Sequence, residues 1–482
     1  MGGEAYADFS PGHREVWVVP LLLGELAYAI GEFERFLEVS KFEFPADLGS
    51  SLVHLPLGHV REEVPCLFTS ERREPTLARY AALVAKFGHA SYSIPACYSE
   101  QMEAPKNILF MFGGVSAEHE VSVVSGLQAL ESLDASLYAP VVIYIGKKGE
   151  MWHLPGVTDR SGFLGAKKSE VSFGRDSKGG YVEARGLFGN WIYPYAAFLA
   201  FHGGSGEGGS LQGLLESSGI PFTSSSTEGS VIAMNKRLTK EVLREAKVPV
   251  LPDVQLFASD IRAEVETAAR SAIGALGLPL IIKPVHLGSS IGINVAHTEI
   301  ELQKGLLTAA FSDEELLLEP FLEGIREYNC AVRRVGDVVE VSEIEKPVSH
   351  DAILSFADKY ERGGKKVGSG MASLSRELPA KIPPELKQRI QDAARRAFIA
   401  CRLKGMARID FMQSEAGDVY LTEVNPIPGS MAFYLWEASG IPFRTQITDL
   451  IEQAVRDAEQ QADLALEYKS DIIERFVQSP KH

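Results

Sequence analysis

Short apolar runs of strand length alternate with helical patterns in the first legible part of the chain. Such runs occupy residues 107–112, 140–145 and 196–201, and a helical pattern with Ser116 as its expected N-cap follows the first of them. Apolar runs of this length that end at glycine are typical of buried strands in a parallel sheet. The alternation therefore predicts an open parallel sheet. Residues 146–190, rich in glycine, lysine and serine, are predicted to be an irregular excursion.

The pattern changes after about residue 226, where hairpins and longer helices replace the alternation. The expected helices are 228–246, 384–403 and a charged tail over 445–478, and the expected strands are 278–283, 291–296, 314–321, 406–412 and 419–425. This part is predicted to be of mixed α+β type. Residues 1–104 show helical periodicity near 22–39 and 76–87 but carry no chemical motif.

The last two strands form the most informative feature. With a loop over residues 415–418, alternation places Arg408 and Asp410 on one face, with Asp410 opposite Glu423 and Arg408 opposite Asn425. Two carboxylates and an amide oxygen would then converge beside one guanidinium. Hard oxygen ligands of this kind suit Mg²⁺ held against phosphates. The residues by themselves are equally compatible with a surface cluster of mixed charge.

Three glycine-rich loops are candidate binding loops. Lys283 precedes His286-Leu287-Gly288-Ser289-Ser290, whose small residues let backbone amides approach phosphate oxygens. The alternative is a plain turn beside a surface lysine. The loop from His202 to Gly213 follows an expected strand, at the sheet edge where ligands bind, and could otherwise be a flexible linker.

The third loop, residues 113–120, contains Glu118, which could hold an ammonium group or simply complement the helix dipole. His119 is expected on the helix surface. Residues 356–366 are predicted to form a mobile loop in which Lys359 could reach a phosphoryl group. The alternative is that Lys359 and the adjacent Tyr360 are solvated and have no functional role.

Composition limits the class of protein. With 48 Lys+Arg against 64 Asp+Glu, the formal net charge is −16, whereas nucleic-acid backbones select basic surfaces. The 4 cysteines are scattered and have no metal-ligand spacing. No segment is apolar enough to cross a bilayer. The chain is therefore expected to be cytoplasmic, with no nucleic-acid or membrane partner.

Taken in order, these motifs resemble the D-alanine–D-alanine ligase family of the ATP-grasp superfamily. The segments that carry the resemblance are Gly113 to Ser122, His202-Gly203 with Leu211-Gln212-Gly213, Met234-Asn235-Lys236, Lys283 with Gly288-Ser289-Ser290, and the polar hairpin residues. The resemblance covers about residues 107–454. It implies an ATP-grasp fold preceded by an open parallel-sheet ligase domain. Its implied reaction phosphorylates one D-alanine to an acyl phosphate, which the amine of a second D-alanine then attacks.

The resemblance also implies roles for individual residues, which can be grouped by ligand. The implied catalytic and substrate residues are Glu118, His202, Ser289, Lys359, Tyr360, Arg408, Gly429, Ser430 and Met431. Those implied to bind ATP are Lys236, Lys283, Ser290, Glu319, Phe321, Leu322 and Glu327, and those implied to hold two Mg²⁺ (or Mn²⁺) ions are Asp410, Glu423 and Asn425. The family further implies a homodimer and a role in peptidoglycan precursor synthesis.

The expected domain division follows the same resemblance. An extension (1–104) precedes the open-sheet domain (105–226), the ATP-grasp central subdomain (227–321), the C-terminal subdomain with the metal site (322–460) and a helical tail (461–482).

Two features depart from the family pattern. The resemblance does not cover the extension, and Pro428-Gly429 runs straight into Ser430-Met431, without the residues that usually separate these pairs. The second-substrate wall is therefore reshaped, which leaves D-lactate, D-serine or another amino acid open as acceptor. Tyr360 beside Lys359 favours an amine. A non-catalytic ATP-binding regulator is the less favoured alternative, because every charged role is occupied.

Overall fold

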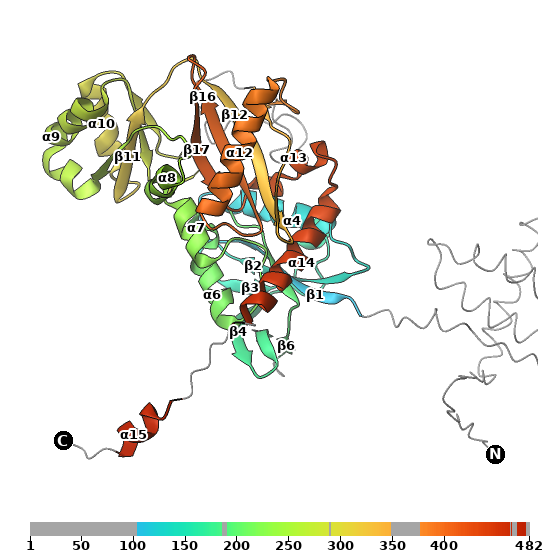
Figure 1. Ribbon diagram of the computed structural model, residues 1–482. Coiled ribbons are helices and arrows are strands. Elements are labelled where there is room, and N and C mark those ends of the chain that lie inside the picture. The colour runs from blue at the N-terminus through green and yellow to red at the C-terminus, as the bar shows by residue number, and fades with distance from the viewer. Residues whose placement is uncertain are drawn as a thin grey trace, which may run out of the picture. The chain divides into compact units, whose positions relative to one another are not determined.

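The computed structural model describes residues 104–185, 190–288, 291–348, 376–462, 464 and 470–478. Both helical patterns expected before residue 104 lie outside this part of the chain. The described residues contain three larger β-sheets and one two-stranded sheet. Figure 1 shows helices α9 and α10 beside β11, and α12 beside β12 and β16. The predicted domain boundaries stay predictions.

The first sheet has seven strands in the order β6-β5-β4-β3-β2-β1-β7. Their bounds are β1 (Lys106–Gly113), β2 (Tyr138–Ile145), β3 (Met151–His153), β4 (Ser169–Asp176), β5 (Gly179–Ala184), β6 (Asn190–Ile192) and β7 (Ala196–Leu199). β1 pairs in parallel with β2 and with β7, which confirms the parallel strands predicted from the apolar runs. β1 and β7 contribute fully buried side chains, including the stacked rings of Phe110 and Phe198.

The expected irregular excursion after residue 146 was wrong, because strands β3 to β6 extend the first sheet in antiparallel fashion. Val171 and Val182 are buried in these strands, whereas most of their neighbours are only half-buried. Gly179, with φ of 126°, lies at the turn between β4 and β5. The glycine and lysine content thus belongs to hairpins covered on one face, in which few apolar residues are needed.

Helix α4 (His119–Glu131) begins later than predicted, and Ser116 is not its N-cap. Glu118 occupies that position, while the Ser116 hydroxyl accepts a hydrogen bond from the Glu118 amide at 3.0 Å. The surface position expected for His119 was also wrong. Its ring is buried and contacts the Gly114 carbonyl (2.7 Å) and the Tyr144 hydroxyl (3.1 Å). Helical periodicity could not reveal this, because the covering residue comes from β2.

Helices α5 (Gly204–Glu207) and α6 (Ser210–Ser218) follow β7, and the single helix expected next is two helices. α7 (Thr227–Met234) ends and α8 (Lys236–Glu245) begins at Asn235, whose φ and ψ of −101° and 103° are extended. The Asn235 side chain accepts a hydrogen bond from the Leu238 amide at 2.9 Å. An asparagine that caps a new helix competes with helix continuation, and α8 therefore begins at Lys236.

The second and third sheets each have four antiparallel strands. The second, β10-β9-β11-β8, consists of β8 (Val254–Phe257), β9 (Leu280–Pro284), β10 (Asn294–Ala296) and β11 (Glu315–Pro320), and it packs on α9 (Ala258–Leu276) and α10 (Glu299–Ala309). The third, β13-β12-β16-β17, consists of β12 (Arg326–Val335), β13 (Val338–Val341), β16 (Met406–Gln413) and β17 (Val419–Asn425), and it packs on α12 (Pro384–Ala400). The expected strands and the α12 helix are confirmed, with shifts at their ends.

The remaining elements are one short helix of the first part and the last elements of the chain. They are η2 (Arg160–Gly162), β14 (Lys346–Pro347) paired with β15 (Arg376–Glu377), η4 (Gly429–Ala432), α13 (Phe433–Ala438), α14 (Phe443–Ala462) and α15 (Ile472–Gln478). The expected helical tail is therefore two helices. Buried residues of α14 join the core of the first sheet, and its Glu452 accepts hydrogen bonds from Tyr138 and Tyr195 at 2.6 and 2.8 Å. α14 thus ties the last part of the chain to the first sheet.

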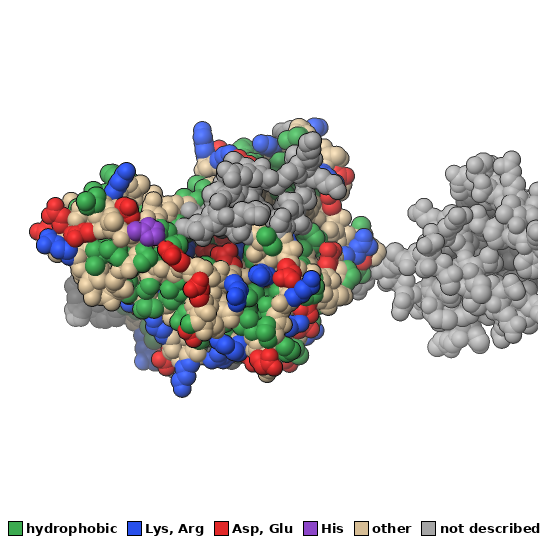
Figure 2. Space-filling view, turned by 90° about the horizontal axis from the view of Figure 1, so that it is seen from above, with side chains coloured by type: hydrophobic (Ala, Val, Ile, Leu, Met, Phe, Trp, Pro, Cys, Tyr) green, Lys and Arg blue, Asp and Glu red, His purple; other side chains and the backbone are tan. Residues whose placement is uncertain are grey.

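The surface carries charges of both signs. Figure 2 shows acidic and basic side chains interspersed on the face in view. Within the described residues, no helix is both long and apolar enough to cross a membrane.

Candidate active site

The β16–β17 hairpin presents four polar side chains in two cross-strand pairs. Arg408 pairs with Asn425 and Asp410 pairs with Glu423, as the alternation predicted. Ile409, on the opposite face of β16, is fully buried against α12. The polar face is therefore free to form a site while the apolar face anchors the hairpin.

A β-bulge corrects the predicted register at the loop end of the hairpin. Gln413, and not Ser414, pairs with Val419, because the register shifts just after Asp410. Thr422 is the additional residue on β17, and its hydroxyl donates to the Asp410 carbonyl oxygen at 3.0 Å. Bulges re-aim side chains beside functional sites. The predicted partners of Asp410 and Arg408 are nevertheless correct, because the shift lies on the loop side of them.

Arg408 and Asp410 form a bidentate ion pair. Both contacts, Nε to Oδ1 and Nη2 to Oδ2, measure 2.8 Å, and Asn425 Nδ2 donates to the same Asp410 Oδ2 at 3.1 Å. Burial by itself lowers the pKa of Arg408, but the Asp410 carboxylate outweighs it and raises the pKa well above the ordinary value. Arg408 is therefore a permanent cation beside the hairpin carboxylates.

The donor set of the hairpin fits a hard divalent cation. Among the residues that the structure describes, no group of three His, Cys, Asp or Glu side chains is arranged to hold a metal ion. Asp410 and Glu423 therefore need the amide oxygen of Asn425 to bring the donors to three. Carboxylate and amide oxygens are ligands that Mg²⁺ and Mn²⁺ accept.

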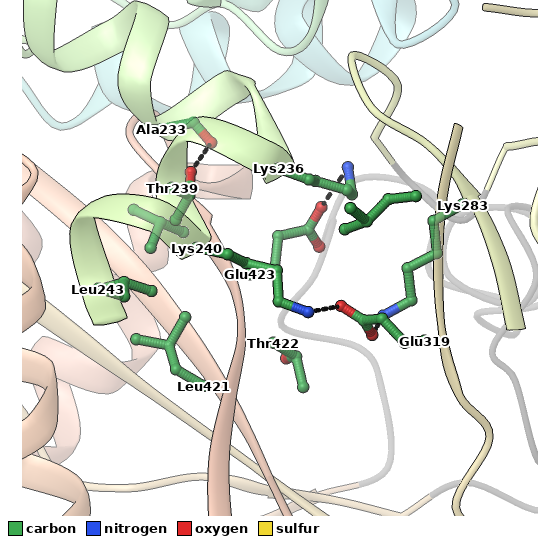
Figure 3. Close-up of a pocket in the computed structure, with 12 residues that line it drawn as sticks. Ala233, Lys236, Thr239, Lys240, Leu243, Lys283, Glu319, Leu421, Thr422 and Glu423 are labelled. Atoms are coloured by element: carbon green, nitrogen blue, oxygen red, sulfur yellow. Dashed lines mark hydrogen bonds and ion pairs between the residues drawn. The ribbon is translucent and has the colours of Figure 1, made fainter. Parts of the chain in front are cut away.

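Lysines from two different elements reach the space between the second and third sheets (Figure 3). Lys236, at the start of α8, lies 3.3 Å from Glu423 Oε1 and donates to the Leu287 carbonyl at 2.6 Å. It thus bridges the β16–β17 hairpin and the glycine-rich loop that contains Leu287. A cation in this position can neutralise phosphate oxygens.

Glu319 on β11 is the centre of a buried ion cluster. Lys283 Nζ lies 2.6 Å from its Oε2, and Lys240 contacts its Oε1. Burial by itself would raise the pKa of Glu319, but the two lysines lower it to about 2. Burial lowers the pKa of Lys240 to about 8 despite this partner. The cluster fixes Lys283 at the wall of the space between the two sheets. Lys240, to which the sequence reasoning gave no role, lines the same space.

The expected adenine hinge begins at Glu319, near the end of β11, and continues beyond this strand. The amide of Phe321 donates to the Pro279 carbonyl at 2.9 Å, and its ring meets His297 edge-on with centroids 6.1 Å apart. Leu322 follows it and is half-buried, and Glu327 is exposed in β12. The backbone therefore leaves the second sheet at Phe321 and enters the third sheet a few residues later.

Glu118 lies against both of the other glycine-rich loops. A Cβ placed on Gly203 would lie 2.8 Å from Glu118 Oε2, and one on Gly288 would lie 3.2 Å from the same atom. Gly203 also has φ of 65°, which disfavours other residues. Glycine is therefore required for the close approach at Gly203. The buried carboxylate of Glu118 is thus placed between a loop of the first sheet and a loop of the second.

His202 is buried and its hydrogen bonds fix its tautomer. Its Nδ1 lies 2.9 Å from the Ile427 carbonyl oxygen, so Nδ1 carries the proton, and its Nε2 lies 2.8 Å from Ser125 Oγ. Burial lowers the pKa of His202 to about 4. His202 therefore does not act as a cation at neutral pH. It connects α4 to the end of β17.

Acid is expected to destabilise the protein through His202. The unfolded state binds a proton below pH 6.5 and the folded state only near pH 4, so stability is lost as the pH falls through this window by about 3 kcal/mol. Urea unfolding at pH 4.5 to 7 would show a shallower pH slope for His202→Gln than for the parent chain. Parallel slopes would contradict the buried neutral ring.

The segment after the hairpin has an unusual backbone. Ser430, Met431 and Ala432 have φ of 49°, 54° and 47°, and all three are buried. A left-handed conformation costs roughly 1–2 kcal/mol per non-glycine residue. Gly429 begins this turn as the first residue of η4. The departure seen in the sequence therefore takes the form of a tight, buried turn that its surroundings must hold.

Buried polar groups around this turn were missing from the sequence prediction. They are Ser125 on α4, Glu207 at the end of α5 and Gln446 on α14, with relative exposures of 1%, 6% and 0%. Burial raises the pKa of Glu207 to about 8, and the carboxylates of Glu118 and Glu423 act in the same direction. Sequence periodicity gave no signal, because each residue contacts a segment far along the chain. Ser289, Ser290, Lys359 and Tyr360 lie outside the described residues.

An open sheet followed by two antiparallel sheets that enclose lysines and carboxylates is the architecture of an ATP-grasp ligase. The family models "D-ala D-ala ligase N-terminus" and "D-ala D-ala ligase C-terminus" match residues 107–225 and 242–452. The D-alanine–D-alanine ligase of Shouchella clausii is 33% identical over 389 residues, which span 77% of this chain and 100% of that protein. The chain belongs to the D-alanine–D-alanine ligase family.

Solved structures agree with this assignment. The D-alanine-D-alanine ligase from Coxiella burnetii superposes with a TM-score of 0.61 and 25% identity, covering 78% of this chain and 98% of its own. The VanG D-Ala:D-Ser ligase from Enterococcus faecalis also has a TM-score of 0.61, at 27% identity, covering 73% and 99%. Structural neighbours thus include ligases named for different second substrates.

Proposed function

We propose that this chain joins two D-alanine molecules in an ATP-dependent reaction that passes through an acyl phosphate and supplies a dipeptide for peptidoglycan synthesis. The observation that best supports the proposal is the approach of Glu118 to Gly203 and Gly288. It brings a carboxylate from the start of α4 to the loop that follows Lys283. If Glu118 binds the ammonium group and this loop binds phosphate, the two would be adjacent, as carboxylate activation requires.

The donor amino acid would bind between these loops. Its ammonium group would contact Glu118, and its carboxylate would lie toward Arg408 and the Gly429 amide, which would stabilise the oxyanion of the tetrahedral intermediate. His202 would support this site through the backbone of Ile427. The acceptor's carboxylate would be bound at Ser430 and Met431.

ATP would lie between the second and third sheets. Lys236 and Lys283 would contact its phosphates, the stretch beginning at Glu319 and including Phe321 and Leu322 would hold adenine, and Glu327 would bind ribose. In the proposal Ser289 and Ser290 belong to the phosphate-binding loop, and Lys359 and Tyr360 exclude water from the acyl phosphate. Exclusion of water matters because an acyl phosphate hydrolyses.

Asp410, Glu423 and Asn425 would hold two Mg²⁺ or Mn²⁺ ions. Such ions neutralise phosphate oxygens during transfer. The residues of the chain itself then position the reactants, while Arg408 keeps its charge at any physiological pH because the adjacent Asp410 raises its pKa.

The second substrate is the less constrained part of the proposal. The family resemblance implies that the segment before Ser430 and Met431 is shortened, and these residues form a tight turn. One structural neighbour is named a D-Ala:D-Ser ligase. D-Serine, D-lactate or another amino acid is therefore the second candidate acceptor. We also propose a cytoplasmic homodimer with the predicted five-part domain division. A non-catalytic ATP-binding regulator is disfavoured because the charged residues form one connected site.

Phosphate release from ATP and Mg²⁺ tests the proposal. We expect release that depends on D-alanine, with D-alanyl-D-alanine identified by mass spectrometry, and weaker release when D-serine or D-lactate is added as acceptor. Glu118→Gln should raise the KM for the donor by about 10- to 100-fold, because a charged hydrogen bond is lost. Release that requires D-serine or D-lactate would change the acceptor, and ATP binding without any turnover would favour the regulator.

A further inference from the structure

The backbone amides of Ser430 and Met431 in the turn Ser430–Ala432 are both hydrogen-bonded within the protein. The Ser430 amide donates to Ser125 Oγ at 3.0 Å, and the Met431 amide donates to the Pro428 carbonyl at 2.9 Å. The Ser430 hydroxyl makes no hydrogen bond with a residue that the structure describes. Of the donors in this Ser-Met pair, the hydroxyl is the one left for an acceptor's carboxylate, so its position depends on how the turn is held.

One side of the turn is held from the first sheet. Ser125 on α4 donates its hydroxyl proton to His202 Nε2 (2.8 Å) and accepts the Ser430 amide, so its hydroxyl has a partner in each direction. His202 in turn donates to the Ile427 carbonyl, while Glu207 accepts from the Ile427 amide at 3.1 Å. The backbone is thus held at Ile427 and at Ser430 by side chains that lie outside the third sheet.

The other side of the turn is held from α14. Gln446 Nε2 donates to the Met431 carbonyl at 2.8 Å, and Gln446 is fully buried. The same nitrogen lies 2.9 Å from Met406 Sδ. A buried amide in this position fixes the second peptide of the turn from the side opposite α4. Left-handed residues persist only where surrounding contacts hold them. The hydrogen bonds of Ser125 and Gln446 to the turn supply such contacts.

We propose that Ser125 and Gln446 are positioning residues that hold the Ser430–Ala432 turn in its left-handed form and thereby set the choice of acceptor. The proposal rests on the proposed function, which binds the acceptor's carboxylate at Ser430 and Met431. Neither residue touches substrate. Each acts on one backbone group of the turn, and the loss of either lets the turn relax toward ordinary φ values and moves the Ser430 hydroxyl.

Kinetics with two variants test this role. Ser125→Ala removes the acceptor of the Ser430 amide, and Gln446→Met keeps the volume but removes the donor to Met431. Each should raise the KM for the acceptor by at least about 10-fold, which corresponds to about 1.4 kcal/mol. The KM values for ATP and donor should stay within about 2-fold, and the ratio of D-alanine to D-serine used as acceptor should change.

Two matched variants serve as controls. Gln453→Met replaces a second buried glutamine of α14, which bonds Gly336 and Asp457 instead of the turn. Ser218→Ala removes a buried serine hydroxyl that bonds only the Leu214 carbonyl of its own helix. Both should leave the acceptor KM unchanged. An equal rise in acceptor KM for controls and test variants would mean a general loss of packing and would overturn the proposal.

Hydrogen exchange gives a readout that does not need activity. The amides of peptides covering residues 427–434 should exchange at least about 10-fold faster in Ser125→Ala and in Gln446→Met than in the parent chain. In the two control variants their exchange rates should equal those of the parent chain. Unchanged exchange in both test variants would overturn the positioning role. If the parent chain releases no phosphate with any acceptor, the proposed function fails, and exchange alone decides whether these residues hold the turn.

Discussion

Arg408→Lys is expected to lower kcat by about 100- to 1,000-fold, which is the effect of removing one oxyanion donor from an active site. Lysine keeps the charge but cannot form both 2.8 Å contacts with Asp410 or present the same planar fork. Arg408→Met should in addition destabilise the fold, by up to about 3 kcal/mol, because the partly buried Asp410 would lose its charged partner. Phosphate release and urea unfolding would measure the two effects separately.

Arg333 offers a matched control for this prediction. It is likewise an ion-paired arginine of the third sheet and is more deeply buried than Arg408. It pairs with Glu340 (2.9 Å) and Asp449 (3.0 Å) and is stacked over Trp436 with 4.7 Å to the ring centroid. Arg333→Lys should lose stability but keep kcat within about 3-fold. Equal losses of kcat in both lysine variants would show that Arg408 acts only through stability.

Glu423→Gln is expected to lower turnover by at least about 1,000-fold at millimolar Mg²⁺, because charge neutralisation by metal and its ligands supplies much of phosphoryl-transfer catalysis. The change keeps the shape of the side chain but removes a charged oxygen donor and the partner of Lys236 at 3.3 Å. The Mn²⁺ affinity should fall by at least about 10-fold. Electron paramagnetic resonance of free Mn²⁺ measures this affinity without turnover.

Glu415→Gln is the corresponding control, since Glu415 is an exposed glutamate in the loop of the same hairpin. It should change neither the Mn²⁺ affinity nor turnover by more than about 2-fold. If Glu423→Gln bound Mn²⁺ as tightly as the parent chain, Glu423 would not be a metal ligand, and its role would be limited to holding Lys236.

In the β16–β17 hairpin, the cross-strand pairs could be predicted from the sequence but the bulge could not. Alternation with a period of two decides which side chains share a face, so Asp410 opposite Glu423 could be predicted once a loop was chosen. The bulge at Thr422 could not, because it depends on a hydroxyl that reaches the Asp410 carbonyl across the strands. The predicted pairing of Asp410 with Glu423 is nevertheless correct, because the register shift lies on the loop side of this pair.

The histidines show the opposite case. His119 was expected on a helix surface, and His202 carried no sign of burial, yet both rings are buried. Tyr144 of β2 covers the first, and Ile427 together with Ser125 holds the second. A local pattern records which face of a helix is apolar, but it does not record which distant element covers a polar ring.

The fold class, the family resemblance and most of the polar residues of the proposed site could be predicted from the sequence, because they depend on local periodicity and on short segments of fixed order. Only tertiary contacts establish what surrounds the proposed acceptor site. Ser125, Glu207 and Gln446 come from three elements far apart in the chain, and only folding brings them to the turn after Pro428. That turn is held by long-range hydrogen bonds, and long-range bonds leave no period in a sequence.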